Sequence, residues 1–336
     1  MYLLNIYIRN TELKYYVKLN LFISCIINYT LRKMGIKLLN KFLAQETKTT
    51  SRHLSTFANK KIAIDISIYL YQFKKESDNW LSKLYRMCII FRHHRIRPIF
   101  VFDGFERSVD KKKTLEKRRE IRHELFEKID EIEKGDEISE ENMKLLDDLK
   151  KKTRRPNRGD ILKAKELLDA CGLNYIQPNG EADEVCVALV NKNIVYACLS
   201  NDTDMFALGC KRIMKNFNIV SHNVDFYSLG DVVTKLNMDI ESFKQLCVLS
   251  GTDYNFTNKN IFYFYKMYNK YNKIELENLQ FLEWLVCNRK ITQQVYNQVE
   301  KVFELYSTNN SLKQFKFMNI KNNKLNINRV NILLFG

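Results

Sequence analysis

The sequence predicts an α/β protein with a mainly parallel sheet, because short apolar runs alternate with helical patterns along much of the chain. Three apolar runs end at aspartates: Ile62–Ile64 before Asp65, Ile99–Phe102 before Asp103, and Val195–Leu199 before Asp202 and Asp204. Runs without polar alternation are typical of strands buried on both faces. The helical patterns between them cover Trp80–His93, Arg158–Cys171 and Glu181–Lys192.

Composition narrows the class of protein and of partner. The chain has 336 residues, of which 45% are hydrophobic and 12% aromatic, so disordered, collagen-like and disulfide-stapled chains are excluded. Its 55 basic and 39 acidic residues give a net charge of +16. We expect a polyanionic partner, nucleic acid before a membrane.

The cysteines and the apolar segments indicate the compartment. Eight cysteines are scattered without a C-x-x-C pair or a histidine at zinc spacing, and most lie in apolar runs, as buried thiols of a reducing compartment do. The apolar stretch at Leu21–Ile27 is far shorter than the ~20 residues of a membrane span. We expect an intracellular protein that does not enter a membrane.

Residues 1–33 and 105–158 differ from the rest of the chain. Residues 1–33 run into Met34-Gly35, a ready-made protein start, so we expect an extension that is not translated or is disordered. Residues 105–158 are charged throughout, with seven basic residues in 111–122. Their sparse hydrophobic residues predict helices that project from the body. These are Leu115, Leu125, Ile129, Ile132, Leu145, Leu146 and Leu149.

After about residue 235 the sequence predicts helices only. One helix over Ile240–Leu249 ends at Ser250-Gly251, where Gly251 suits a C-terminal cap. The Asn- and Lys-rich tail after Ser307 is a weakly ordered candidate. We therefore divide the chain into a domain over 34–235 and a helical region over 236–336.

Seven acidic residues follow or begin these elements, and the carboxyl ends of parallel strands meet at one edge of a sheet. Such a cluster repels itself unless divalent cations neutralise it. Oxygen ligands alone favour Mg²⁺ or Mn²⁺ over zinc, and two such ions ~4 Å apart serve displacement at a phosphodiester. Taken singly, an acid such as Asp65 could instead cap a helix. The acids are Asp65, Asp103, Glu181, Asp183, Asp202, Asp204 and Asp253.

Six motifs in order then carry a family resemblance. They are Met34-Gly35-Ile36-Lys37, KKIAIDIS at 60–67, VFDG at 101–104, GEADE at 180–184, SNDTDMFALG at 200–209 and LSGTDY at 249–254. They resemble the successive signatures of the flap endonuclease/XPG-type structure-specific 5′ nucleases, including versions encoded by large DNA viruses. The resemblance is collinear from Met34 to about Ile274.

The resemblance implies a fold and an activity. The fold is a PIN-like twisted, mainly parallel sheet flanked by helices, with a helical arch at about 105–158 and a C-terminal all-helical DNA-binding region that holds a degenerate helix–two-turn–helix. The activity is a Mg²⁺-dependent 5′-flap endonuclease and 5′–3′ exonuclease acting on branched DNA in replication, repair or recombination. Two Mg²⁺ ions per site are implied, with Mn²⁺ able to substitute.

The resemblance also implies roles for individual residues. The seven acids fall on the family's metal ligands. Lys111 and Arg118 have the spacing of the family's pair that contacts the scissile phosphate, but Lys112 and Arg119 have the same spacing, so the register is open by one. The remaining DNA-binding candidates are Arg122 on the face of Arg118, Gly35 beside the active site, and Asn258, Lys259 and Asn260 in the helix–two-turn–helix, where K⁺ binds.

Departures from the family pattern keep alternatives open. Asp183 stands where the eukaryotic pattern has a glutamate. The segment Tyr71–Phe102 is short, so the loop that would bind a 3′ flap is trimmed. In the helix–two-turn–helix, asparagines such as Asn260 replace glycines. Asparagine tolerates the left-handed conformation, so we expect that motif to survive. The alternatives are a catalytically silent DNA-binding scaffold and a PIN-like or 5′-exoribonuclease-type RNA nuclease.

The partner and location follow from the same resemblance. We expect a monomer that binds branched or flapped DNA in the nucleus or at a viral DNA replication site. The later glutamines lack the neighbours of a sliding-clamp-binding motif. The histidines, including His93 and His94, are predicted to lie on a basic helix face without a catalytic role.

Overall fold

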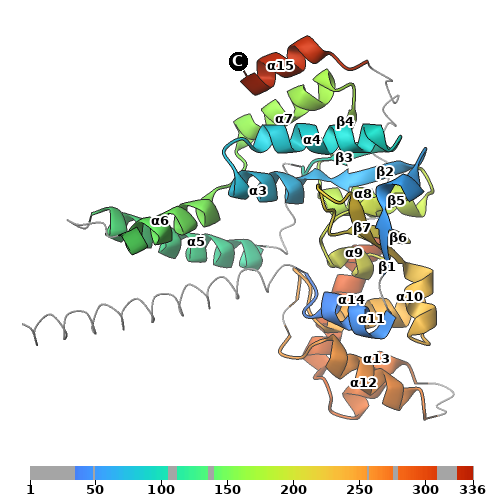
Figure 1. Cartoon of the computed structure of the whole chain (residues 1–336). Helices are drawn as coiled ribbons and strands as arrows, with labels where there is room; N and C mark the ends of the chain where they lie inside the picture. Colours follow the sequence, from blue (N-terminus) through green and yellow to red (C-terminus); the bar gives the residue numbers. More distant parts are fainter. Residues whose placement is uncertain are drawn as a thin grey trace, which may run out of the picture.

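The computed structural model describes most of the chain outside its N-terminus (Figure 1). The described residues are 35–47, 50–104, 112–134, 140–255, 257–274, 279–308 and 324–335. The predicted extension at 1–33 lies outside them. Among the described residues, no helix combines the length and the apolar character that a membrane span needs.

A seven-stranded sheet forms the centre, in the order β1-β7-β6-β5-β2-β3-β4. β2 pairs in parallel with β3 and β5, and β4 and β6 extend the parallel part on either side, whereas β7 and β1 are antiparallel. The mainly parallel α/β sheet is therefore confirmed. The strands are β1 Thr50–His53, β2 Lys61–Asp65, β3 Arg97–Val101, β4 Asn174–Ile176, β5 Ala197–Leu199, β6 Arg212–Lys215 and β7 Asn223–Ser228.

Two apolar clusters cover the two faces of the sheet, because successive side chains of a buried strand point to opposite faces. In β2, Ala63 belongs to one cluster, and Ile62 and Ile64 belong to the other. In Figure 1, α4 and α7 lie above the sheet, and α11, α12 and α13 lie below it. The helices of the body are α2 Leu39–Thr47, α3 Ile66–Glu76, α4 Trp80–His93, α7 Arg158–Ala170, α8 Ala182–Asn191, α9 Asp204–Ala207 and α10 Leu229–Lys235, with the short 3₁₀ helix η1 at Leu54–Phe57.

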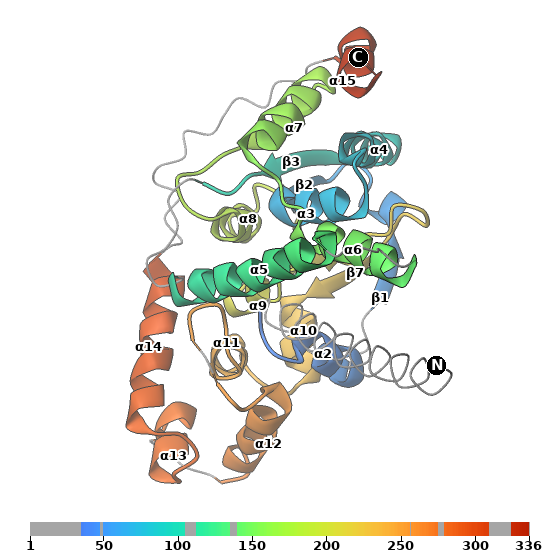
Figure 2. The same ribbon diagram turned by 90° about the vertical axis from the view of Figure 1, so that its left-hand side faces the viewer.

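The charged segment forms a helical hairpin that projects from the body (Figure 1). Its helices are α5, Lys112–Glu133, and α6, Glu140–Thr153. In Figure 2, α5 runs below β2 and β3 and passes in front of α9. The sparse hydrophobic residues of this segment pack on one another in a small cluster of their own, and the projecting helices are therefore confirmed. The cluster contains Leu125, Ile129, Leu145 and Leu149, with Ile132 and Leu146 against it.

The region after residue 235 contains only helices among its described elements. They are α11 Ile240–Leu249, α12 Ile261–Tyr271, α13 Phe281–Cys287, α14 Gln293–Thr308 and α15 Ile327–Phe335. The first four share the cluster that covers the lower face, and Phe206 of α9 meets Phe243 of α11 edge to face at 6.3 Å. The apolar core thus continues across residue 235, and the division at that residue stays a prediction.

The end of the chain returns to the upper face of the sheet. The Asn326 amide donates to the Ala170 carbonyl at the end of α7 over 2.8 Å, and Val330 of α15 is buried against the same cluster. The weakly ordered tail predicted after Ser307 therefore includes a packed helix, α15, after residues 309–323, which lie outside the described part of the chain. The sequence did not indicate this contact, because it joins segments more than 150 residues apart.

Candidate active site

The carboxyl ends of three neighbouring strands bring acidic side chains together. Asp65 is the last residue of β2, and Asp103 comes two residues after β3. The Asp202 and Asp204 pair follows β5. Asp65 is in register with Val101, the last residue of β3. The three strands therefore deliver their acids to one edge of the sheet, as predicted.

Asp65 is the buried centre of this group. Its side chain is 6% exposed, and Oδ2 accepts a hydrogen bond from Ser200 Oγ at 3.0 Å. Its Oδ1 is buried and has no hydrogen-bond partner among the described residues. Burial raises the pKa of Asp65 well above its usual range, and the charges of Asp103, Asp183 and Asp202 raise it further. Asp103, Asp183 and Asp202 therefore lie within electrostatic reach of Asp65.

A second group surrounds Asp204, at the start of α9. Asp204 Oδ2 accepts from the Asp253 amide at 3.4 Å and from the Tyr306 hydroxyl at 3.5 Å. Asp202 Oδ1 accepts from the Asp204 amide at 2.9 Å, which connects this group to the first. Burial raises the pKa of Tyr306, and the charges of Asp204 and Asp183 add to that shift. The acid after α11 is thus joined to the acids at the sheet edge.

The N-terminus of α8 completes the cluster. Glu181 is the residue before the helix and Asp183 lies in its first turn. The Ala182 amide donates to Asp103 Oδ1 at 3.2 Å, which ties the end of β3 to this helix. A carboxylate is favoured at this end of a helix by the macrodipole. Neither Asp65 nor Glu181 makes a side-chain capping bond, although each occupies an N-cap position. The alternative of a simple cap is therefore not supported for these two acids.

Gly35 lies directly against the acids. Its φ is +72°, and a Cβ atom at this position would stand 2.0 Å from Thr203 Oγ1 and 2.9 Å from Asp202 Oδ1. The next amide, of Ile36, donates to Thr203 Oγ1 at 2.6 Å. Only glycine fits this approach. The position is the one that the family resemblance implied.

Lys215, at the end of β6, is a residue of this site that the sequence did not reveal. Its side chain is 1% exposed, and Nζ donates to the Asn201 carbonyl at 2.7 Å. Burial lowers the pKa of Lys215 to about 8, while the charges of Asp202, Asp204 and Asp225 oppose this shift. The lysine therefore supports the loop that carries two of the acids. In a chain with 55 basic residues, no local signal distinguishes it.

Three of the four predicted phosphate-contacting residues, Lys112, Arg118 and Arg119, fall on α5 of the hairpin. Lys111 lies outside the described residues. Lys112 and Arg118 fall on α5, but their side chains lie outside the described part. Arg119 is exposed and Arg122 is half-buried on the same helix. The choice between the two registers stays a prediction.

The helix–two-turn–helix candidate connects α11 to α12. Asn258 and Lys259 are exposed, and Lys259 Nζ stands 4.8 Å from the centre of the Tyr263 ring. Asn260 is the N-cap of α12 with φ −123°, and its side chain accepts from the Tyr263 amide at 3.3 Å. The expectation of a left-handed asparagine is therefore wrong for Asn260, which is needed as a cap instead. Gly251 supplies a left-handed residue, with φ +96°.

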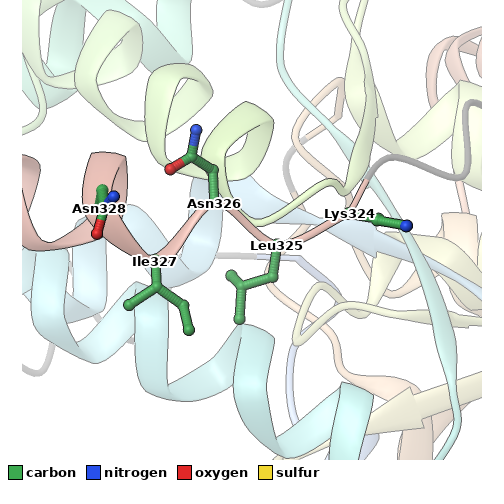
Figure 3. A pocket seen from close by; sticks show the side chains of 5 residues that line it. All are labelled: Lys324, Leu325, Asn326, Ile327 and Asn328. Carbon is green, nitrogen blue, oxygen red and sulfur yellow. The ribbon is translucent and has the colours of Figure 1, made fainter.

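The donor set of the acid cluster fits a hard divalent cation. Every acid in it offers oxygen atoms, and Asp65 Oδ1 is buried without a hydrogen bond from the described residues. Oxygen donors of this kind suit Mg²⁺ and Mn²⁺. A separate hollow of about 420 Å³ lies beside residues 324–328 (Figure 3), and none of its lining side chains is acidic.

Comparison with known proteins decides the family. The XPG N-terminal domain model matches residues 34–125 and the XPG I-region model matches residues 172–253. Flap endonuclease 1 of Encephalitozoon cuniculi is 30% identical over 252 residues, which cover 68% of this chain and 70% of that protein. The chain belongs to the flap endonuclease/XPG family. The six motifs therefore identified the family correctly.

Other members of the flap endonuclease/XPG family are similarly related. Flap endonuclease 1 of Entamoeba histolytica is 30% identical over 249 residues, which cover 68% of this chain. The probable RAD2-like endonuclease 076L of Invertebrate iridescent virus 3 is 28% identical over 291 residues, covering 68% of this chain and 76% of that protein. This chain spans 64% of the length of the Entamoeba histolytica protein.

Solved structures share the fold of this family member. The catalytic core of Rad2 in complex with DNA substrate aligns with a TM-score of 0.60 at 18% identity, over 89% of this chain and 94% of that one. Human GEN1 in complex with Holliday junction DNA aligns with a TM-score of 0.60 at 17% identity, over 89% of this chain and 72% of that one. The PIN-like α/β fold is therefore confirmed.

Proposed function

We propose that this protein is a divalent-metal-dependent, structure-specific 5′ nuclease that hydrolyses phosphodiesters of branched or flapped DNA. The single observation that supports it best is the meeting of the acids at one sheet edge, close enough for three of them to raise the pKa of Asp65. A positively charged chain, at +16, gains nothing for DNA binding from such a cluster. The cluster has a physical reason only if cations bind it.

The cations belong at the acid cluster. Asp65, Asp103, Asp183 and Asp202 would hold them, with Asp204, Asp253 and Glu181 completing the set through the contacts at α9, α11 and α8. When bound, two Mg²⁺ ions supply activation of water and neutralisation of charge on the phosphate oxygens. Mn²⁺, with similar ligand preferences, is expected to substitute.

The chain's own residues would position the DNA. Lys111 and Arg118, or the pair one residue later, would contact the scissile phosphate from the base of the hairpin and stabilise the charge that develops there. Gly35, without a Cβ atom, lets the protein backbone approach Thr203 and Asp202 beside the acids. The segment Asn258–Asn260 with a K⁺ ion would hold the duplex backbone.

Two alternatives are separated by one experiment. A catalytically silent scaffold would bind flap DNA without cutting it, and an RNA nuclease of PIN-like or 5′-exoribonuclease type would prefer matched RNA. The purified full chain is offered 5′-flap DNA and the same structure in RNA, with Mg²⁺ or with EDTA. We expect Mg²⁺-dependent cleavage of the DNA near the junction between single and double strands.

The matched variants are Asp202→Ala and Asp169→Ala. Asp202→Ala should abolish cleavage and leave flap-DNA binding within a few-fold of wild type, because losing a negative charge does not weaken attraction to a polyanion. Asp169 is exposed on α7, so its variant should cut normally. Cleavage in EDTA, or by the Asp202 variant, would contradict the proposal.

A further inference from the structure

Three of the chain's five histidines come together, although they lie far apart in the sequence. They are His53 at the end of β1, His94 at the C-terminal end of α4, and His222 in the loop before β7, and their ligand atoms lie within 4.8 Å of one another. His94 Nε2 and His222 Nδ1 are 2.9 Å apart. The ring of His53 meets that of His94 edge to face at 4.9 Å.

Backbone hydrogen bonds hold each of the three in place. His53 is paired with Asn223 in the β1–β7 ladder, and the Leu54 amide donates to the His222 carbonyl at 2.9 Å. The His94 amide donates to the Ile90 carbonyl in the last turn of α4. His222 has φ +56° and its amide donates to the Asn218 carbonyl at 2.9 Å. The fold thus fixes the backbone positions of all three histidines.

The histidines are remote from the acids. His94 precedes β3 and Asp103 follows it, so the whole strand separates them, a length of roughly 16 Å for its five residues. The charges that act on His94 and His222 come from the other histidines and from Arg86, not from carboxylates. The two sites are therefore independent.

The imidazoles are suited to metal ligation because a ligating nitrogen must be deprotonated. Burial lowers the pKa of His94 and of His222, and the neighbouring histidines, His93 among them, lower both pKa values further. His53 Nδ1 lies 2.8 Å from Ser55 Oγ, a contact that orients the ring and leaves Nε2 for a metal. Neutral imidazoles without carboxylates suit zinc and not magnesium.

We propose that His53, His94 and His222 bind one Zn²⁺ ion, which links the end of β1 to the end of α4 and to the loop before β7. Nitrogen ligands lie about 2 Å from a bound zinc ion. The three histidine nitrogens lie within 4.8 Å of one another, so rotation of the side chains brings all three to one ion. A water molecule takes the fourth position. Structural zinc sites usually have four protein ligands, so the role of this site follows from its position: it links the end of β1, the end of α4 and the loop before β7.

The test measures zinc binding by the full-length, chelator-treated protein. Competition against a chromophoric chelator is run in saturating Mg²⁺, which occupies the acid cluster. We expect one equivalent of Zn²⁺ for wild type and at least a tenfold loss of affinity for His53→Ala and for the His94→Ala/His222→Ala pair. His123→Ala is the matched control, because His123 is exposed on α5 and pairs with Glu127. That variant should bind as wild type does.

Two further readouts keep the test decisive. Zn²⁺ should raise the melting temperature of wild type and of His123→Ala, and leave that of the paired variant unchanged. Co²⁺ should give the visible absorption of a tetrahedral nitrogen site only where His94 and His222 are present. His53 is exposed, so its loss does not disturb the core. Full-affinity zinc binding by the paired variant, or no binding by wild type, would overturn the proposal.

Discussion

Lys215 illustrates how a single residue beneath the site carries an energetic cost. A buried ammonium loses hydration, and the Asn201 carbonyl and nearby acids offset only part of that loss, since its pKa is lowered to about 8. The lysine is neutralised in the folded protein at a lower pH than in the unfolded chain. Between pH 8 and 10.5 the unfolded chain holds more protons, so this residue makes stability rise with pH.

Lys215→Met tests this sign. Methionine keeps much of the volume but leaves the half-buried Asn201 carbonyl without the Lys215 donor, which should cost about 1–3 kcal/mol. Urea unfolding in EDTA at pH 7 and at pH 9.5 should show wild type gaining stability relative to the variant at the higher pH. Lys60→Met, at an exposed position, is the control. A difference that does not depend on pH would contradict the assigned shift.

Asp65 has the opposite kind of shift. Its folded-state pKa lies above the unfolded value, so the folded protein holds the extra proton and stability falls as pH rises from about 4 through the raised pKa. Asp65→Asn should therefore raise the melting temperature in EDTA at pH 8 and change it little near pH 4. Added Mg²⁺ should stabilise wild type more than the variant. Equal melting of the two proteins at pH 8 in EDTA would argue against this electrostatic strain.

Among single residues, the sequence predicted the acids of the site better than the residues that hold them in place. Asp65 and Asp103 could be predicted because they directly follow apolar runs. Lys215 and Tyr306 could not be predicted, because each depends on a partner from another segment, Asn201 for Lys215 and Asp204 for Tyr306. Burial of a charged group is a property of the assembled core, so no local pattern marks it.

Among the elements, the α5–α6 hairpin has a core of its own and few other apolar residues. It can therefore present basic side chains without disturbing the sheet. Lys111→Ala and Arg118→Ala should each slow cleavage by about 2–4 kcal/mol of barrier and weaken DNA binding much less. Single-turnover rates and binding constants are compared on one flap substrate. Larger losses for Lys112→Ala and Arg119→Ala would assign the other register, and equal losses in rate and binding would indicate a nonspecific patch.

The connection between α3 and α4 is short, with only Ser77, Asp78 and Asn79 between the helices. This leaves little chain to enclose a 3′ flap. A single unpaired 3′ nucleotide added to a 5′-flap substrate should therefore change the rate and the cut position little. Rates on the paired substrates, one with and one without the nucleotide, provide the measurement. Strong stimulation would mean that other residues form the pocket.

The sequence predicted the bounds of a helix with a strong apolar pattern, but it did not predict the strands at the two edges of the sheet. α4 begins and ends at the predicted residues, Trp80 and His93, because its apolar face repeats over four turns. β1 is exposed at all four positions, so it has no buried run to reveal it. β4 has three residues and belongs to the other edge of the sheet. Edge strands are specified by pairing more than by composition.

At the scale of the whole molecule, the described chain starts inside the site, since Gly35 touches Thr203 and Asp202. A protein that starts at Met34 keeps this approach of Gly35 to the site. We expect a protein that begins at Met34 to fold and to be at least as active as the 336-residue form. Flap cleavage and melting of the two purified forms decide it. A large loss of stability or activity in the shorter form would show that residues 1–33 belong to the fold.

The contact between Tyr306 and Asp204 has a consequence for synthesis on the ribosome. The acids come from five segments between residues 65 and 253, and the helix that covers Asp204 comes later still, in α14. The lower apolar cluster likewise joins Ile36 to Tyr306. A nascent chain therefore cannot complete this core until residue 306 has been made. We therefore expect a nascent chain of the proposed nuclease to cut no nucleic acid before α14 has been made.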